Sequence, residues 1–455
     1  MGKKIIVIGG GPAGYVAAIR AAQGGAAVRL IEKTAIGGTC LNVGCIPTKV
    51  LLRTAEFFHR AANASVPGVK SAAELDWPLA LLHKDAIVKQ MSGGISRLLQ
   101  HNNVQVIPGL ATILPGLRVR VGAQTLQADA IVIATGSLNA ELPFAGSDLD
   151  GVIDSAAALA LGEPPKSVAV IGGGAIGIEF ATLFAHLGAE VTVMEMMPEI
   201  LPSFDGEIAG HLRGMMSASG TNFLLDTFLE SVERAGDALV VCANMGTHVE
   251  LIQVQTVLVA AGRRPNTSGL GLETAGIATD RGAVLVDADY QTNIKGIYAV
   301  GDCNAHMMLA HAAMEQGIAA AEHILGIESN GSPAYVPSCV YSSPEIASVG
   351  KTERQLQEGC IQYAAGRFSL AGNGKARIEG GEGMVKVLAG KDFGEVLGVH
   401  VIGPNAAEII AEAAVCMKME GTVDDIVRTI HPHPTVSESL WEAAMAVGGT
   451  AIHGV

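Results

Sequence analysis

The chain has few aromatic residues, no excess of positive charge and no long apolar runs. Aromatic residues make up 4% of its 455 residues, against 49% for all hydrophobic types, so the core is expected to be aliphatic. The formal net charge of -14 argues against nucleic acid or an anionic membrane surface as a partner. No apolar run reaches the length of about 18 residues that a membrane-spanning helix needs.

Cysteine is also scarce. The seven cysteines are odd in number and scattered, which excludes the paired framework of a disulfide-rich secreted protein. The sequence opens with MGKKIIVIGG and shows no apolar core and cleavage site of a secretory signal. We therefore expect a cytoplasmic protein.

Glycine, in contrast, is abundant. The 57 glycines exceed the average share of about 7%, and chains rich in Gly, Ala and Val are typical of α/β nucleotide-binding folds. The length predicts about three domains, each large enough to bury a core of its own.

A dinucleotide fingerprint stands at the start of the chain. The apolar strand at residues 4–8 runs into Gly9, Gly11 and Gly14 in the pattern G-x-G-x-x-G, a helical segment follows, and a second strand ends in Glu32. The glycines permit a tight turn and close approach of a pyrophosphate to the helix N-terminus, and the acid accepts from a ribose hydroxyl. Strand, helix and acid together make this a strong signal.

The same pattern recurs at residues 167–195. It contains Gly172, Gly174 and Gly177, and its second strand ends in Glu195. The alternative, a degenerate glycine turn, leaves the complete context unexplained. We predict two dinucleotide sites in two nested Rossmann-like domains.

Two further apolar strands run into tight turns, at residues 128–137 and 296–304. Gly301 and Asp302 stand where the second of these strands ends and a helical pattern begins at residue 308. An acid at such a position either binds a polar cofactor chain or caps the helix.

The last part of the chain has no nucleotide fingerprint. It follows a stretch rich in Gly, Ser and Pro at residues 328–338, which we interpret as a domain boundary. Two β-type runs, at 383–389 and 395–403, then precede an amphipathic helix at 406–420. A domain without a cofactor of its own is a candidate for an interface.

The stretch GGTCLNVGCIPTK places Cys40 and Cys45 five residues apart. In an ideal helix their Cα atoms would be about 8.6 Å apart, beyond the limit of about 7 Å for a disulfide. A disulfide here therefore requires distorted backbone at Gly44 and at the residue before Pro47, and it would be readily reduced, as catalytic disulfides tend to be. Two unrelated buried cysteines or half of a zinc site are the alternatives, but no further ligands follow nearby, and we predict no metal.

These motifs, together with IYAVGD and the near-terminal HPHPTVSE, resemble the flavoprotein pyridine nucleotide-disulfide oxidoreductases over essentially the whole chain. Within the family, LNVGCIP, MLAHAAMEQG, VYSSPEIASVG and RTIHPHPTVSE are most similar to the branch that oxidises dihydrolipoyl groups with NAD+. The resemblance implies an FAD-binding domain at 1–144 that is completed by 269–333, an NAD-binding domain at 145–268, and an α+β dimerisation domain at 334–455.

As partners, the resemblance implies a second copy of the chain, in a homodimer, and the lipoylated proteins of 2-oxoacid or acetoin dehydrogenase or glycine cleavage complexes. It does not distinguish among these complexes.

The resemblance also assigns roles at the redox centre. Cys40 would exchange with the dithiol substrate, and Cys45 would form a thiolate against the flavin. Lys49, one helical turn after Cys45, would favour that thiolate, and Glu179 would pair with Lys49. The alternative for Lys49 is an ordinary surface lysine. Without the resemblance, Glu179 is equally well interpreted as a helix-dipole glutamate.

His433 and Glu438 would form the base of the reaction. The resemblance implies that His433, oriented by Glu438, removes a proton from the dithiol in the other subunit's site. The alternative is a solvated histidine-rich turn.

The remaining assignments concern the cofactors, with Glu32 on the adenosine ribose and Asp302 on the ribityl chain. The predicted FAD-binding residues are Gly9, Gly11, Gly14, Glu32, Lys33, Gly38, Thr39, Lys49, Thr135, Gly136, Gly301, Asp302, Met308, Leu309, Ala310 and His311. The predicted NAD-binding residues are Gly172, Gly174, Ala175, Ile176, Gly177, Glu179, Glu195, Ala261 and Gly262.

Two residues depart from the family's pattern. Cys303 follows Asp302 directly, and we interpret it as a small buried hydrophobe rather than a third redox thiol. Pro432 stands between His431 and His433 and leaves the setting of His431 open.

Other functions within the family fit less well. Mercuric reductases carry a C-terminal cysteine pair, whereas this chain ends in GGTAIHGV. Glutathione reductases use NADPH, which calls for basic residues where this chain has Glu195, Met196 and Met197. A purely structural role in a complex would leave the full set of catalytic residues unexplained.

Overall fold

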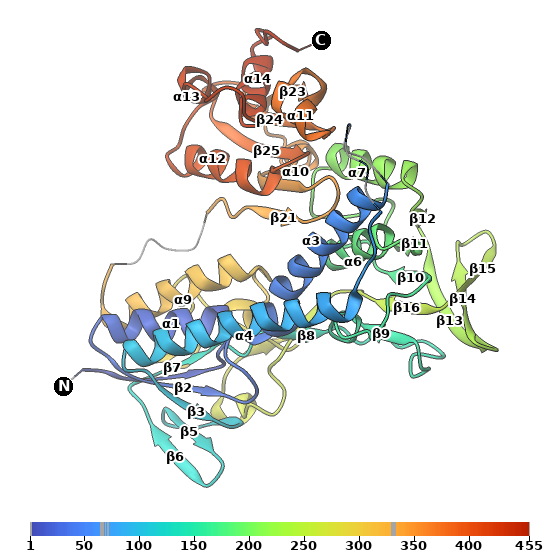
Figure 1. Ribbon diagram of the computed structural model, residues 1–455. Coiled ribbons are helices and arrows are strands. Elements are labelled where there is room, and N and C mark those ends of the chain that lie inside the picture. Colours follow the sequence, from blue (N-terminus) through green and yellow to red (C-terminus); the bar gives the residue numbers. More distant parts are fainter. Residues whose placement is uncertain (1, 64–67, 69, 71, 329–333, 455) are drawn as a thin grey trace.

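The structure, a computed structural model, describes residues 2–63, 68, 70, 72–328 and 334–454. Three domains are visible in Figure 1: one with the N-terminus at the lower left, a second in green at the right, and a third in orange and red at the top with the C-terminus. The predicted boundary between residues 333 and 334 adjoins residues 329–333, which lie outside the described residues. The other two boundaries, at 144/145 and 268/269, stay predictions.

The first domain is built on a five-stranded parallel sheet with helices on one face and a three-stranded antiparallel sheet on the other. Its parallel strands are β1 (Lys4–Ile8), β2 (Ala27–Glu32), β3 (Gln105–Pro108), β7 (Ala130–Ile133) and β20 (Ile297–Ala299); the antiparallel strands are β4 (Ala111–Leu114), β5 (Arg118–Val121) and β6 (Gln124–Gln127). Its helices are α1 (Pro12–Gln23), α2 (Gly38–Val43), α3 (Cys45–Ala62), α4 (Trp77–His101) and α9 (Ala310–Leu325), with the 3-10 turn η1 (Gly301–Asn304).

The inner strands β1 and β7 are apolar and buried at residues 5–8 and 130–133 because both of their faces are covered. In β1, Ile5 and Val7 pack against the helices, whereas Ile6 and Ile8 pack against the antiparallel sheet. The strand order is β20-β7-β1-β2-β3, so residues from far along the chain complete the first sheet. The predicted strands at 128–137 and 296–304 therefore lie side by side.

The second domain repeats this plan. Its parallel strands, in the order β9-β16-β10-β11-β12, occupy the positions of β20-β7-β1-β2-β3 in the first domain. They are β9 (Val152–Asp154), β10 (Ser167–Ile171), β11 (Glu190–Met194), β12 (Asn222–Leu224) and β16 (Thr256–Val259); the antiparallel sheet is β13 (Phe228–Ala235), β14 (Ala238–Asn244) and β15 (Val249–Val254), and the helices are α5 (Ser155–Ala158), α6 (Ala175–His186) and α7 (Gly206–Ala218).

Short elements join the first two domains. The main link is an antiparallel pair that follows β7 and β16 at equivalent points of the two domains. This pair is β8 (Ser137–Asn139) and β17 (Arg263–Pro265); the elements that follow, α8 (Leu272–Ala275), β18 (Thr279–Asp280) and β19 (Ala283–Val284), pack against the first domain.

The third domain is an antiparallel sheet in the order β21-β22-β25-β24-β23, with helices against one face. Its strands are β21 (Ser338–Val340), β22 (Ile346–Gly350), β23 (Tyr363–Ser369), β24 (Met384–Gly390) and β25 (Val396–Ile402); its helices are α10 (Glu353–Glu358), α11 (Gly374–Glu379), α12 (Ala406–Lys418), α13 (Val423–Arg428) and α14 (Glu438–Val447), with the turn η2 (Leu370–Gly372). The α/β fold class and the two predicted strand runs are confirmed. The helix predicted to begin at residue 308 begins two residues later.

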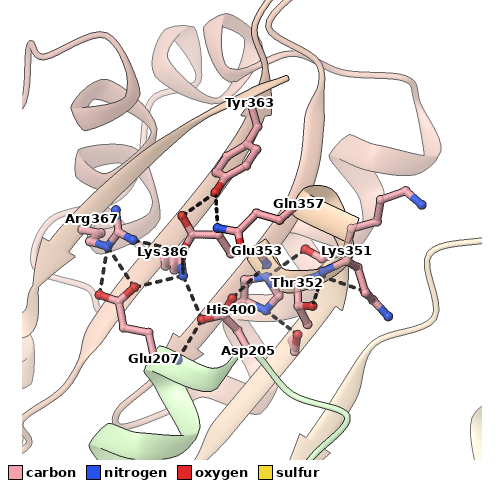
Figure 2. Close-up of polar contacts among 12 residues, drawn as sticks. Asp205, Glu207, Lys351, Thr352, Glu353, Gln357, Tyr363, Arg367, Lys386 and His400 are labelled. Atoms are coloured by element: carbon pink, nitrogen blue, oxygen red, sulfur yellow. Dashed lines mark hydrogen bonds and ion pairs between the residues drawn. The ribbon is translucent and has the colours of Figure 1, made fainter. Parts of the chain in front are cut away.

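An ionic cluster ties the third domain to the second (Figure 2). Val385 and Val387 of β24 face the helices of their own domain, while Lys386 between them points to the other face, towards α7. Lys386 is 1% exposed, and its Nζ lies 2.8 Å from Asp205 Oδ1, 2.9 Å from Glu207 Oε2 and 2.6 Å from Glu353 Oε2. Three carboxylates from two domains therefore share one buried ammonium group.

Candidate active site

The two cysteines lie on either side of a break between helices. Cys40 belongs to α2 and Cys45 is the first residue of α3, with Gly44 between the helices at φ -147° and ψ -114°. A Cβ on Gly44 would lie 3.0 Å from Thr39 O and 3.4 Å from Cys40 Cα. The distortion expected at Gly44 is present, and the close contact explains why glycine stands there.

The distortion expected at the residue before Pro47 is wrong. Ile46 and Pro47 are the second and third residues of α3, and both are helical. In the first turn of a helix the backbone N–H has no partner within the helix, so proline is tolerated there without a break.

The structure distinguishes the two sulfur atoms. The Cys40 thiol hydrogen-bonds to Cys45, and this bond, with help from the Lys49 ammonium group and against the effect of burial, lowers the pKa of Cys45 to about 7. The same bond, followed by burial, raises the pKa of Cys40 above its usual value. Both directions favour the thiolate on Cys45, the cysteine nearer to the Lys49 charge.

Lys49 is held by residues from the other two domains. Its Nζ lies 2.8 Å from both oxygens of Glu179, which is buried in α6, so the structure brings together the two residues expected to pair. Tyr341, just after β21, donates its backbone N–H to Glu179 Oε1 at 3.1 Å and places its ring 4.6 Å from Lys49 Nζ. Neither a surface lysine nor a simple helix-dipole glutamate describes this arrangement. Sequence reasoning missed Tyr341, because no local spacing links it to the other two residues.

The first glycine motif has the shape that a dinucleotide needs. Gly9 has φ +106°, and a Cβ there would lie 2.2 Å from Ala134 O; a Cβ on Gly14 would lie 1.9 Å from Gly9 O. A Cβ on Gly38, which has φ +58°, would lie 2.6 Å from Gly11 Cα. The segment that leads to Cys40 therefore packs directly against the glycine motif.

The second glycine motif has the same geometry. Gly172 has φ +109°, and a Cβ there would lie 2.6 Å from Ala260 O, while a Cβ on Gly177 would lie 1.9 Å from Gly172 O. Gly174, at the N-terminus of α6, has open space beside it, as has Gly262 after β16. Ala175 and Ile176 begin α6, and Ala261 lies beside Gly262.

The two acids at the strand ends are fixed in the same way. Glu32 accepts from Gly10 N at 2.6 Å and Thr34 N at 2.7 Å, and Glu195 accepts from Gly173 N at 2.6 Å and Met197 N at 2.8 Å. Because a carboxylate has about four acceptor positions, each acid keeps lone pairs free for a ribose hydroxyl.

Asp302 lies in η1 and does not cap a helix. Neither η1 nor α9 has a side-chain cap, so that alternative is wrong. Asp302 Oδ2 instead accepts from Ser137 Oγ, which in turn accepts from Arg263 Nε at 2.7 Å. Arg263 is not among the residues predicted from the sequence, although it directly follows the predicted residues Ala261 and Gly262.

A buried hydroxyl group beside this chain of bonds also fits a cofactor. Thr135 Oγ1, two residues after β7, is buried and has no hydrogen-bond partner among the described residues, and a polar cofactor atom would supply one. The other predicted FAD residues fall into two groups. Lys33 and Thr39 are exposed. The rest lie at strand ends or at the start of α9: Gly136, Gly301, Met308, Leu309, Ala310 and His311.

His433 and Glu438 form a pair, but not with the cysteines of the same chain. His433 Nδ1 lies 2.9 Å from Glu438 Oε1, and 79% of the histidine side chain is exposed. Glu438 Oε2 accepts from Thr435 N at 2.8 Å, which fixes the carboxylate. Within the described part of the chain, no hydrogen bond or ion pair joins this pair to Cys40 or Cys45.

Cys303 is fully buried, and burial raises its pKa to about 12. Its Sγ contacts the carbonyl oxygens of Ile133 and Val300 at 3.4 and 3.3 Å, as expected of a small core residue. The described residues include no group of three or more His, Cys, Asp or Glu side chains placed to hold a metal ion. Nor does any helix in the described ranges have the length and apolar character needed to cross a membrane.

Comparison with known families agrees with this geometry. Residues 3–317 match the pyridine nucleotide-disulphide oxidoreductase family, and residues 336–444 match its dimerisation domain. The chain belongs to this family. FAD and NAD are its cofactors, and the dimerisation domain supports a homodimer.

Relatives and solved structures narrow the position within the family. Dihydrolipoyl dehydrogenase 2 of Arabidopsis thaliana is 42% identical over 99% of this chain and 91% of its own length. Dihydrolipoyl dehydrogenase of Bacillus subtilis is 40% identical over 99% of both chains. The structure of LpdA from Mycobacterium tuberculosis superposes with a TM-score of 0.90 at 30% identity, covering 97% of this chain and 99% of that one.

Proposed function

We propose that this chain is a dihydrolipoyl dehydrogenase, which oxidises protein-bound dihydrolipoyl groups and reduces NAD+. The observation that carries the proposal is the cysteine pair at the break between α2 and α3, with the Lys49–Glu179 ion pair one helical turn after Cys45. This pair belongs to a chain that is similar from end to end to named dihydrolipoyl dehydrogenases.

The proposed reaction begins with a Cys40–Cys45 disulfide and a dithiol substrate. His433 of the partner subunit takes a proton from one substrate thiol, and the resulting thiolate attacks Cys40 Sγ, so that Cys45 leaves as a thiolate. The second substrate thiol then displaces Cys40, which takes up the other proton. The substrate leaves as a cyclic disulfide, and its two electrons now reside on the cysteine pair. Bound FAD supplies the two-electron carrier from this pair to NAD+.

The chain's own residues support this exchange through charge and position. Lys49 stabilises the Cys45 thiolate, and Glu179 fixes the lysine. Ser137 and Arg263 orient Asp302 for the ribityl chain of FAD. Glu32 and Glu195 each present a fixed acceptor to one ribose.

A simple assay tests the proposal. NAD+ reduction by dihydrolipoamide is expected, without reduction of glutathione disulfide or Hg(II) by NADPH. Failure of the first reaction, or a faster second one, would overturn it.

The partners proposed are lipoylated proteins of 2-oxoacid or acetoin dehydrogenase or glycine cleavage complexes. A cytoplasmic location agrees with the seven scattered cysteines, an odd number that does not form the disulfide framework of a secreted protein. A pull-down from native extract, followed by detection of lipoyl groups, identifies the complex.

We predict a preference for NAD+ over NADP+, because the fixed Glu195 carboxylate accepts from a 2′-hydroxyl and repels a 2′-phosphate. About 1.4 kcal/mol of repulsion already gives a tenfold ratio in kcat/KM, so the wild type should favour NAD+ by at least that factor. Glu195→Arg should move the ratio towards NADP+. Glu190→Arg, the same change at an exposed position on β11, should leave it unaltered. Equal use of both cofactors by the wild type would contradict the assignment.

We also predict that the thiolate of Cys45 is visible by absorbance. In the two-electron-reduced enzyme, a long-wavelength band from the thiolate beside oxidised flavin should weaken as the pH falls through about 7, because protonation removes the thiolate. Cys45→Ser should abolish the band, whereas Cys360→Ser, a change at an exposed thiol, should retain it. A band that survives Cys45→Ser would assign the flavin-side thiol to another residue.

A further inference from the structure

His431 forms a second histidine–carboxylate pair close to the first. Its Nε2 lies 2.6 Å from Glu412 Oε1 on α12, and its Nδ1 lies 3.0 Å from the carbonyl oxygen of Thr429. Only 5% of the His431 side chain is exposed, against 79% for His433 two residues later. Pro432 between them therefore does not prevent His431 from turning inward.

The partners of His431 determine its protonation. A backbone carbonyl and a carboxylate accept hydrogen bonds but do not donate them, so both ring nitrogens must carry a hydrogen. A ring protonated on both nitrogens is a cation. In agreement, the hydrogen bond to Glu412 raises the pKa of His431, with burial opposing it. At His433, by contrast, only Nδ1 has a partner among the described residues, which leaves Nε2 free to accept a proton.

Glu438 connects the two imidazoles. It hydrogen-bonds to His433, and the positive charge of His431 acts to lower the pKa of Glu438. Burial raises the pKa of Glu438, but the Thr435 N–H, His433 and the charge of His431 together hold it below its usual value. The charged groups that face His431 are thus Glu412 from α12 and Glu438 from α14.

We propose that Glu412 and His431 are positioning residues that hold a positive charge beside His433 and so support its role as proton acceptor. The inference rests on the proposed role of His433 as base. The physical reason is that like charges repel, so a fixed imidazolium opposes a second positive charge nearby. The same cation, anchored to Glu412 and Thr429, fixes the loop that carries His433.

The kinetic test is the pH profile of His431→Gln, in which glutamine removes the charge and keeps a donor for Glu412. We expect the midpoint of the acid limb of kcat/KM for dihydrolipoamide to rise by about half a pH unit, which lowers the rate at pH 6 by about threefold relative to the wild type. NADH oxidation by an artificial acceptor should not change. Asp424→Asn, which removes a charge from an exposed ion pair on the neighbouring α13, should leave the midpoint in place. A uniform loss of rate with an unmoved midpoint would reduce His431 to a structural role and overturn the proposal.

The second test observes the proton directly. In the flavin-loaded dimer labelled with ¹⁵N-histidine, the His431 signals, assigned by their loss in His431→Gln, should show both nitrogens protonated at pH 7, above the ordinary histidine pKa of about 6.5. In Glu412→Gln the same signals should titrate near the ordinary histidine value of about 6.5. A neutral His431 in the wild type at pH 7 would overturn the proposal. This measurement needs no substrate, so it remains decisive even if the dihydrolipoyl activity is not found.

Discussion

We expect His433→Ala to lower NAD+ reduction by dihydrolipoamide about 10²- to 10⁴-fold, the range for loss of a general base. The substrate thiol must lose its proton before it attacks, and we propose that the exposed His433 imidazole, fixed by Glu438, is the base that removes it. NADH oxidation by an artificial acceptor should persist in the variant, because it does not require that proton transfer. His101→Ala, a change at an exposed histidine at the end of α4, is a matched control that should alter neither rate.

A mixture of variants tests where His433 acts. Consider a dimer of one His433→Ala chain and one Cys45→Ser chain. If His433 of each chain acts on the cysteines of the other chain, one site has both defects and the other site has none. Random exchange makes half of the dimers mixed, each with one sound site, so about a quarter of wild-type activity should return under two-fold symmetry. No recovery, with subunit exchange confirmed by mass, would mean that each site is built within one chain.

The second large effect is expected at Lys386. Lys386→Ala should lower the free energy of unfolding by about 3 to 5 kcal/mol, the usual result of removing one partner from a buried ion pair. Asp205 would be left 2% exposed without its cation, and Glu207 and Glu353 would lose theirs in part. Denaturant unfolding of the flavin-loaded dimer, at fixed protein and cofactor concentration, measures the change.

Two further variants separate charge from packing. Lys386→Met keeps a long apolar side chain on β24 but leaves the carboxylates unpaired, so it should be nearly as unstable as Lys386→Ala. Lys375→Ala breaks a partly exposed ion pair with Glu379 and should cost about 1 kcal/mol or less. A Lys386→Met variant as stable as the wild type would show that the ammonium group contributes no net stability.

The sequence predicts what local spacing encodes. Each glycine motif places strand, turn, helix and acid within about thirty residues, so both nucleotide folds follow from it. The cysteine pair is equally local. The expectation at the residue before Pro47 failed because the steric preference against helical backbone before a proline is a bias and not a prohibition, and because Pro47 stands in a first turn, where no hydrogen bond is lost.

Contacts between distant segments could not be predicted in this way. Tyr341, Arg263 and Glu412 reach Glu179, Ser137 and His431 only after separate domains or helices have packed together. Lys386 sits in a strand whose other residues are all small or apolar, and its purpose is apparent only when α7 lies against it. The pattern of apolar and polar residues within one segment does not identify the residues of another segment that it will contact.

The return of β20 to the first sheet imposes an order on synthesis. The first sheet needs residues 297–299, which leave the ribosome after about two thirds of the chain has been made. All the parallel strands of the second sheet lie between residues 152 and 259 and emerge earlier. The central domain can therefore finish its sheet while the first domain is still missing an edge strand, which reverses the usual progression from the N-terminus. Until residues 297–299 emerge, one edge of β7 in the nascent first domain has no strand beside it. An unpaired strand edge can pair with another chain, so the growing chain is most prone to aggregation during this interval.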